Sequence, residues 1–365
     1  MKVIIQIVQS VAPDFQNEDI QTPFQELGID SIDLVSIRVE IEKHIGYEIL
    51  EYKWYEFENF QDIVRHIGKA KKYPKQPCEV INHVSERQYL IGMPQMANSS
   101  LSENWLFKEM GDIHWELLCK GLNTKSGSIT DESGNRLYAT FTRIQTECCP
   151  LSNFKENQPL SVTGTINRFG NLTYISKIQG NSGQESITAS LMTSFTKRGG
   201  ADNLDLIKSQ PHVTKNTIEE LDGTPPFFND YRLMRKGLTN DYLLCSVPFD
   251  LNKASDFSTI YELNPYYDIN GVGLIYFAAY PVVSDFCESR YFNNLDSVQQ
   301  WETEFKTISR DIFYYANCNS NDNIVYKLNQ YEFYMGNKVK ISCTLYRQSD
   351  GIAMANIFTL KQRQE

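Results

Sequence analysis

The stretch Gly28-Ile29-Asp30-Ser31-Ile32-Asp33-Leu34 places a serine between two acidic residues at the predicted start of a helix. Apolar residues continue beyond it at a spacing close to that of one helical face, at Val35, Ile37, Ile41 and Ile45. Acidic side chains are favourable near a helix N-terminus because of the helix dipole. Ser31 is then either an ordinary N-cap or a hydroxyl that can carry a covalent group without disturbing the core.

The wider pattern favours the second interpretation, because the segment resembles the acyl carrier protein family. That family has Asp-Ser-Leu or Asp-Ser-Ile at the start of its second helix. The positions that match are Leu27, Asp30, Ser31, Ile32, Val35, Ile37, Ile41 and Glu42. The resemblance covers about residues 1–73 and implies an all-α, four-helix carrier domain. It also implies that Ser31 carries 4′-phosphopantetheine, attached by a phosphopantetheinyl transferase. Helices are expected at 3–12, 31–45 and 59–70.

Length and composition limit the remaining possibilities. The chain has 365 residues, of which 41% are hydrophobic, which suits two or three domains with real cores. No apolar run approaches the roughly 18 residues that a membrane span needs. The first residues, Met1-Lys2-Val3-Ile4-Ile5-Gln6, are interrupted by polar side chains too soon for a secretory signal. We therefore expect a cytoplasmic protein without a membrane partner.

Negative charge is concentrated in the carrier-like segment. The net charge of the chain is −10, and residues 1–73 hold 13 acidic and 8 basic side chains. This density suits docking to a basic surface on polyketide synthase or fatty-acid-type enzymes. Nucleic-acid binding is not expected with this charge balance.

The eight cysteines are scattered and form no Cys-x-x-Cys pair, and the chain has five histidines. Neither a zinc site nor a disulfide framework is indicated. We expect no metal and no redox cofactor.

Beyond the carrier-like segment, the sequence predicts a helix followed by strands, and this order occurs twice. Pro74 and Pro77, among several lysines, predict a linker over 74–84. A helix is expected at 101–122, because its apolar residues form one stripe. Alternating runs rich in β-branched and aromatic residues then predict strands at 136–145, 160–168, 172–178 and 186–197. These elements form a first unit, 85–200, and a polar connection follows at 201–230.

The second unit, 231–365, repeats this order. It has a strand-like run at 242–249 and an apolar helix within 270–286. Further strands are expected at 310–317, 324–335, 338–347 and 352–361. A helix followed by antiparallel strands predicts an α+β class, with each sheet wrapped on a central helix.

A group of polar residues precedes the second apolar helix. Asp268, Asn270, Gly271 and Gly273 stand in the sequence Asp-Ile-Asn-Gly-Val-Gly. This resembles the Asp-x-Asn-Gly-His motif of hot-dog thioesterases and dehydratases, with Val272 in place of the histidine. Asn270, Gly271 and the backbone at Gly273 are candidate donors to a thioester oxygen. The alternative is a capped, buried helix.

The first predicted helix carries a second candidate, His114, in Gly111-Asp112-Ile113-His114-Trp115. Asp112 and His114 are two residues apart and cannot share a helix face, so they form no dyad by themselves. A histidine beside an aromatic residue is more often structural. His114 is therefore a weaker candidate for a direct role.

Two motif blocks resemble the double-hot-dog family of the leinamycin-pathway bifunctional acyltransferase/decarboxylase. They are Met93-Pro94-Gln95 with the helix that follows, and Asn264 to Leu274. The resemblance covers about 85–365 and implies two hot-dog folds and a catalytic tyrosine, for which Tyr138 is the best candidate. A phenol has an ordinary pKa near 10 and needs nearby positive charge to act as a nucleophile. Arg136 and Arg143 are the nearest cations in sequence.

These resemblances lead to three functional hypotheses. The first is an enzyme that decarboxylates an alkylmalonyl-CoA, such as methylmalonyl-CoA, and transfers the acyl group to the arm on Ser31. The second is a dehydratase or thioesterase acting on carrier-bound acyl chains, against which Val272 counts. The third is a non-catalytic module that presents the carrier to other enzymes. Asp268 is the remaining candidate catalytic residue beside Asn270.

Overall fold

Helices form the N-terminal part of the chain. The computed structural model describes residues 1–69, 79–148, 150–200, 202–213 and 215–364. The first range contains α1 (Lys2–Val11), α2 (Ser31–Ile45), α3 (Glu51–Trp54) and α4 (Phe60–Lys69). Their apolar faces enclose a separate core that includes Val8, Ile37 and Phe60. The predicted helices lie within one residue of α1, α2 and α4. Of the predicted linker, 74–84, residues 74–78 lie outside the described residues, and 79–83 form no helix or strand.

The first unit consists of a long helix and an antiparallel set of strands. Its principal elements are β1 (Val84–Leu90), α5 (Glu103–Gly121), β4 (Tyr138–Cys148), β5 (Pro159–Phe169), β6 (Thr173–Ser182) and β7 (Glu185–Arg198). Short strands β2 (Met96–Ala97), β3 (Ser100–Leu101) and β8 (Leu206–Lys208) accompany them. Residues of β5 alternate between buried and half-buried, as expected for a strand with one face on a core. Helix α5 packs on that face, against β5 and β6.

The second unit repeats this plan. Its elements are α6 (Pro226–Arg235), β9 (Asp241–Leu244), β10 (Val247–Asp250), β11 (Ser258–Glu262), α7 (Ala279–Phe292), α8 (Trp301–Glu304), β12 (Phe305–Tyr314), β13 (Asn323–Tyr334), β14 (Lys338–Arg347) and β15 (Ala353–Arg363). Helix α7 packs on β11 and β13, and it also contacts α5 of the first unit. The expected α+β class, with two sheets each wrapped on a central helix, is confirmed.

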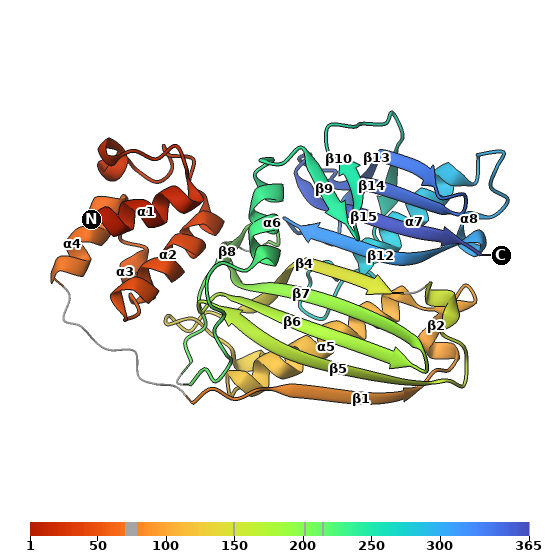
Figure 1. Ribbon diagram of the computed structural model, residues 1–365, viewed down its shortest axis with the longest axis horizontal. Coiled ribbons are helices and arrows are strands. Elements are labelled where there is room, and N and C mark those ends of the chain that lie inside the picture. The colour runs from red at the N-terminus through yellow and green to blue at the C-terminus, as the bar shows by residue number, and fades with distance from the viewer. Residues whose placement is uncertain (70–78, 149, 201, 214, 365) are drawn as a thin grey trace.

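The two sheets join into one. Strands β4 and β12 pair antiparallel, with Ile144 opposite Ile312, so the order runs β1-β5-β6-β7-β4-β12-β15-β14-β13-β11. Figure 1 shows the two units side by side along this junction. The junction buries Arg143, which donates to Asp311 at 2.8 Å and to Tyr242 at 3.1 Å. Arg143 therefore serves the junction and does not lie beside Tyr138.

Three expected elements differ from the structure. Helix α7 begins at Ala279, because Asn270 Oδ1 accepts from Val272 and Leu274 N–H and holds a turn in which Gly273 has φ +82°. The expected strand at 242–249 is the hairpin β9–β10, which turns at Cys245-Ser246, both with positive φ. The expected connection at 201–230 contains β8 and the first half of α6.

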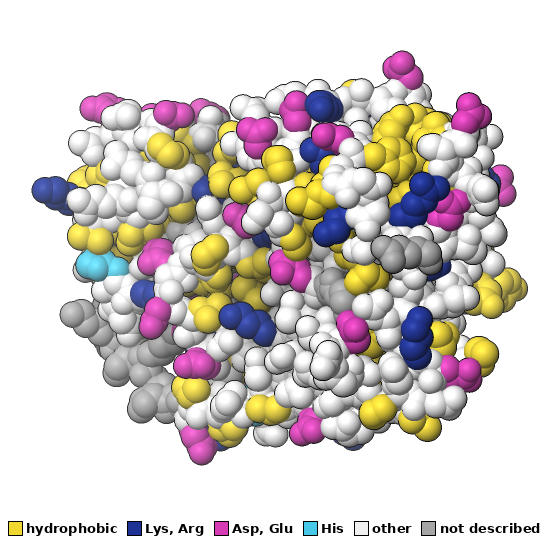
Figure 2. Space-filling model, turned by 45° about the vertical axis from the view of Figure 1, so that its right-hand side comes forward, with side chains coloured by type: hydrophobic (Ala, Val, Ile, Leu, Met, Phe, Trp, Pro, Cys, Tyr) yellow, Lys and Arg dark blue, Asp and Glu magenta, His cyan; other side chains and the backbone are white. Residues whose placement is uncertain are grey.

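The outer surface mixes charges. On the face in Figure 2, acidic and basic side chains are interspersed, and hydrophobic side chains show between them. None of the helices among the described residues is long and apolar enough to cross a membrane.

His114 is buried in the first unit, and this placement predicts acid sensitivity. Its Nδ1 lies 2.7 Å from Ser176 Oγ and its Nε2 lies 2.8 Å from Thr193 Oγ1. Burial lowers the pKa of His114 from 6.5 to about 3. Between these values the unfolded chain binds more protons than the folded chain. The free energy of unfolding should therefore fall as the pH is lowered, by up to about 5 kcal/mol near pH 3.

Urea titrations between about pH 4 and 7 test this expectation. A His114→Gln variant, whose amide can still bond to the two hydroxyls, should show a flatter decline in stability towards acid. The matched change His44→Gln, at an exposed position, should leave the decline unchanged. An unaltered slope in the His114→Gln variant would contradict the assignment.

Candidate functional site

Ser31 is the first residue of α2, and its hydroxyl is available. The N-cap is Asp30, whose Oδ1 accepts from Ile32 N–H at 2.8 Å and from Asp33 N–H at 2.9 Å. The side chain of Asp33 accepts in return from Asp30 N–H at 3.2 Å, which completes a capping box. The capping alternative for Ser31 is therefore wrong. Its side chain is exposed and has no hydrogen-bond partner among the described residues.

Helix α2 is apolar on two sides. Ile37 and Ile41 face the core of the N-terminal helices, whereas Ile32, Val35 and Val39 belong to the core of the two following units. The contact is close at Gly170, where an added Cβ would lie 2.5 Å from Val39 Cγ2, and whose φ of +63° also favours glycine. The carrier is thus packed against the rest of the chain, beside α6 and β8 (Figure 1).

An ion-pair cluster reinforces this packing. The buried carboxylate of Asp33 accepts from Arg232 Nη1 at 3.1 Å and contacts Lys236 Nζ. Arg232 also donates to Val11 O at 3.0 Å, and Lys236 donates to Gly28 O at 3.1 Å. Both cations come from α6 or the residue that follows it. Two cations of the same chain therefore pair with one acidic residue of the carrier, and docking of other enzymes on its acidic face stays a prediction.

These contacts predict that Arg232 holds the carrier in place. An Arg232→Met change removes one partner of a buried carboxylate, for which losses of roughly 3–5 kcal/mol are typical. We expect faster hydrogen exchange at the backbone amides of α2, measured by mass spectrometry. Arg65→Met, which removes an exposed ion pair within the carrier, is the matched control and should leave this exchange unchanged. Equal exchange in both variants would contradict the docking role.

Ser31 lies on a cavity of about 520 Å³ that reaches between the two hot-dog units. Such volumes are usual for ligand sites. Helix α5 contributes Gly111, Asp112 and Trp115, and the β4 and β7 strands contribute Tyr138–Thr142, Ser194 and Thr196. The second unit contributes Tyr231, Arg235, Asn270, Val272, Leu274–Phe277, Tyr280 and Tyr314–Asn317, and residues 204–208 complete the wall. The wall is largely aromatic and aliphatic.

Two arginines, Arg198 and Arg136, lie against Tyr138, which lines the cavity. Arg198, at the end of β7, donates through Nη1 to Tyr138 Oη at 3.2 Å, and its Nη2 contacts Val272 O. Its guanidinium also lies 5.2 Å from the centre of the Tyr138 ring, and that of Arg136 lies 5.3 Å away. Because Arg198 occupies an acceptor position of the phenol oxygen, the hydroxyl proton of Tyr138 can point elsewhere. Asn270 lines the same cavity, and its side-chain NH₂ has no partner among the described residues.

Other predicted site residues have different surroundings. Asp268 is buried and accepts from Asn264 N–H at 2.7 Å and from Tyr261 Oη at 3.1 Å, so it holds the loop before α7. Gly273 N–H donates to Asn270 O and is not available to a thioester. Gly271 and His114 are not among the residues that line the cavity. The structure brings together Ser31, Tyr138 and Asn270, and the other candidates stay outside this group.

Sequence reasoning missed Arg198, Lys208 and Arg235. Arg198 ends a strand, and neither its spacing nor its neighbours in sequence connect it with Tyr138, 60 residues earlier. Lys208 and Arg235 lie in and beside the segment expected to be a polar connection. The doublet Pro225-Pro226 could have indicated α6, since proline is favoured at the first position of a helix.

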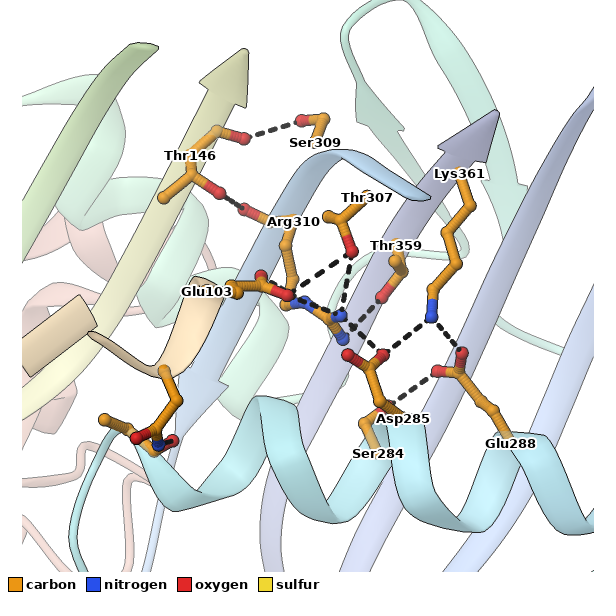
Figure 3. Close-up of polar contacts among 12 residues, drawn as sticks. Glu103, Thr146, Ser284, Asp285, Glu288, Thr307, Ser309, Arg310, Thr359 and Lys361 are labelled. Carbon is orange, nitrogen blue, oxygen red and sulfur yellow. Dashed lines mark hydrogen bonds and ion pairs between the residues drawn. The ribbon is translucent and has the colours of Figure 1, made fainter. Parts of the chain in front are cut away.

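A second cavity, of about 740 Å³, lies between the loop before α5 and helix α7. Figure 3 shows its buried ion-pair network, in which Arg310 on β12 points between Glu103 and Asp285. Arg310 Nε donates to Glu103 at 2.7 Å and its Nη2 to Asp285 at 2.7 Å, while Lys361 binds Asp285 and Glu288. Burial alone would raise the pKa of Asp285, but the two cations hold it at about 2. The two cations and three carboxylates fasten α5 and α7 to the sheet. Ser31 does not line this cavity.

No group of three or more histidine, cysteine, aspartate or glutamate side chains in the described ranges is arranged to hold a metal ion.

Comparisons with known proteins agree with this architecture. Residues 2–67 match the family model described as a phosphopantetheine attachment site. A structure from Lactobacillus plantarum, assigned as an oleoyl thioesterase, aligns with a TM-score of 0.56 and 9% identity, over 78% of this chain and 98% of that one. A 12:0-ACP thioesterase from Umbellularia californica aligns with a TM-score of 0.48 and 12% identity, over 77% and 98% of the two chains. A search of curated sequences found no match.

The chain therefore has an N-terminal phosphopantetheine-binding carrier domain followed by a hot-dog fold like that of thioesterases. At 9% identity the structural likeness establishes the fold alone.

Proposed function

We propose that the hot-dog part is an enzyme that acts on an acyl thioester held by Ser31 of the same chain. The observation that carries this proposal is the position of Ser31 on the cavity that also contains Tyr138 and Asn270. A 4′-phosphopantetheine arm on Ser31 would enter that cavity without movement of the carrier. Tethering in this way gives the arm a high effective concentration at the site.

The reaction that the residues support best is decarboxylation of an alkylmalonyl-CoA with transfer of the acyl group to the arm. The Tyr138 oxygen attacks the thioester carbon, the carbon–sulfur bond breaks, and CoA leaves as the thiol. The bond from the α-carbon to its carboxylate breaks, CO₂ leaves, and a proton from solvent is added to the α-carbon. The arm's thiol then attacks the tyrosyl ester, so the acyl group becomes a thioester on the arm and the Tyr138 hydroxyl is restored.

The cavity offers specific support for each step. Arg198 stabilises negative charge that develops on the Tyr138 oxygen. The Asn270 NH₂ is a donor for the carbonyl oxygen as it becomes an enolate. Aromatic side chains of the wall, among them Phe141, Tyr276 and Phe277, offer an apolar surface that favours loss of a carboxylate as CO₂.

Hydrolysis and water loss have less support. The lining residues include no histidine, and Val272 occupies the position of the motif's histidine. The lining carboxylates are those of Asp112 and Asp205. The first is exposed and paired with Arg87 at 2.8 Å, and the second is exposed. Neither is a buried general base.

The test uses the full chain after phosphopantetheinyl transfer, with malonyl-, methylmalonyl- and propionyl-CoA added separately. Intact-mass spectrometry then reads the arm. Propionyl loading from methylmalonyl-CoA, with release of CO₂, is the expected result. Retention of the whole methylmalonyl group would contradict decarboxylation. Release of free acid, or water loss from a preloaded hydroxyacyl chain, would assign a thioesterase or dehydratase. If no thioester reacts, the remaining hypothesis is a non-catalytic module that presents the carrier to other enzymes.

A further inference from the structure

We propose that Lys208 and Arg235 form a receptor, within the hot-dog part, for the phosphodiester that joins phosphopantetheine to Ser31. This inference rests on the proposed attachment at Ser31. Its consequence is that modification of the carrier itself strengthens docking, before any acyl group is present.

The first observation is the shared position of these three side chains. Ser31 and Lys208 both line the 520 Å³ cavity and also a smaller one, of about 220 Å³, between α2 and β8. Arg235 lines the larger cavity with them. A phosphodiester on the Ser31 hydroxyl would therefore stand at the junction of the two cavities, beside both cations.

The second observation is that Lys208 lacks a partner. Its Nζ is shielded from solvent and makes no hydrogen bond among the described residues. A buried ammonium group without a partner is costly, so it calls for an anion. Burial lowers the pKa of Lys208 to about 7, and the positive charge of Arg235 acts in the same direction. In the unmodified chain two cations thus line one cavity, and the charge of one disfavours that of the other.

Arg235 is only partly engaged. Its Nη1 donates to Tyr231 Oη at 3.3 Å, and no carboxylate among the described residues forms an ion pair with it. The charge of Asp30, the cap of α2, acts on both cations. Arginine presents several donors in a fork that suits phosphate oxygens, and lysine adds a point charge.

The backbone around Lys208 is fixed by the carrier. Lys208 O accepts from Tyr55 Oη at 2.7 Å, and Gln210 N–H donates to Glu51 at 2.6 Å. Arg38 on α2 donates to the Gln210 side chain at 3.1 Å. These bonds hold β8 against α2 and α3, so the ammonium group stays at the interface when the carrier is docked.

The test compares melting temperatures of the apo and holo full chains without any acyl donor, after intact-mass spectrometry has confirmed modification. We expect the native chain to melt a few degrees higher when modified, about 2–4 °C for one added charge-assisted contact. Lys208→Met retains the aliphatic stem. It should leave the apo chain equally or more stable, and it should remove the rise. Lys155→Met, at an exposed lysine, should keep the rise.

An equal rise in the Lys208→Met chain would overturn the proposal. Arg235→Gln provides a second variant if Lys208→Met does not fold, and it should also reduce the rise. A Ser31→Ala chain mixed with millimolar CoA tests whether free CoA is the true ligand. Stabilisation there that depends on Lys208 would assign the site to CoA and overturn attachment as its source. Failure of the acyl-loading reaction leaves this comparison unaffected, because no thioester is used.

Discussion

A chain with Ser31→Ala is expected to gain neither the mass of phosphopantetheine nor any later acyl group. The reason is that the Ser31 hydroxyl, left free by the Asp30 cap, is the proposed attachment point. The loss should be complete, and intact-mass spectrometry after incubation with the transferase and methylmalonyl-CoA measures it. Ser36→Ala, five residues further along α2 and buried, is the matched control and should still be modified. Stable acylation of the Ser31→Ala chain would place the acceptor elsewhere.

Mixing two variants then shows whether the carrier is loaded by the cavity of its own chain. The Ser31→Ala chain keeps the cavity, and the modified Tyr138→Phe chain keeps the arm. Because the docked carrier already occupies the interface, the cavity of one chain should load the arm of another only slowly. Restoration of the native loading rate in the mixture would show that one chain efficiently loads the arm of another. That result would contradict the cis arrangement.

The second large effect is expected for Tyr138→Phe in the loading reaction. Removal of the phenol oxygen abolishes the proposed acyl intermediate, while the ring can keep its contact with Arg198. Removal of a covalent nucleophile can cost up to about 10⁶-fold in the chemical step. Single-turnover loading from methylmalonyl-CoA, followed by quenching and mass spectrometry, gives the rate.

Tyr266→Phe is the matched control, because that side chain is 95% exposed on the loop before Asp268. It should load at the native rate. A Tyr138→Phe chain that loads within a few-fold of native would exclude the tyrosyl ester and favour direct attack by the thiol of the arm.

Sequence patterns predicted most of the fold, because the strands and α5 carry strong periodicity. The expected strand at 338–347 coincides with β14, and α5 lies within the expected 101–122. The errors arose where side chains override the pattern. Asn270 holds a turn with its side-chain oxygen, and this turn displaces the start of α7 although the residues around it are apolar.

Much less of the candidate site could be predicted. Ser31 had a motif, and Tyr138 and Asn270 came from resemblances to families. The partner of Tyr138 could not be predicted, because Arg198 reaches Tyr138 only through the pairing of β4 with β7. The proposed role of Lys208 and Arg235 likewise depends on where the carrier docks. The docking contact uses a second apolar side of α2, and a helical pattern with one apolar face does not reveal it.

In the proposed function, that second apolar side affects the timing of the catalytic cycle. Another enzyme would reach the acyl group only after Ile32, Val35 and Val39 had left their packed positions and Asp33 had separated from Arg232. Dissociation rates, more than association rates, distinguish related complexes. The residence time of the carrier on its own chain would therefore set how quickly a loaded acyl group becomes available to the next enzyme.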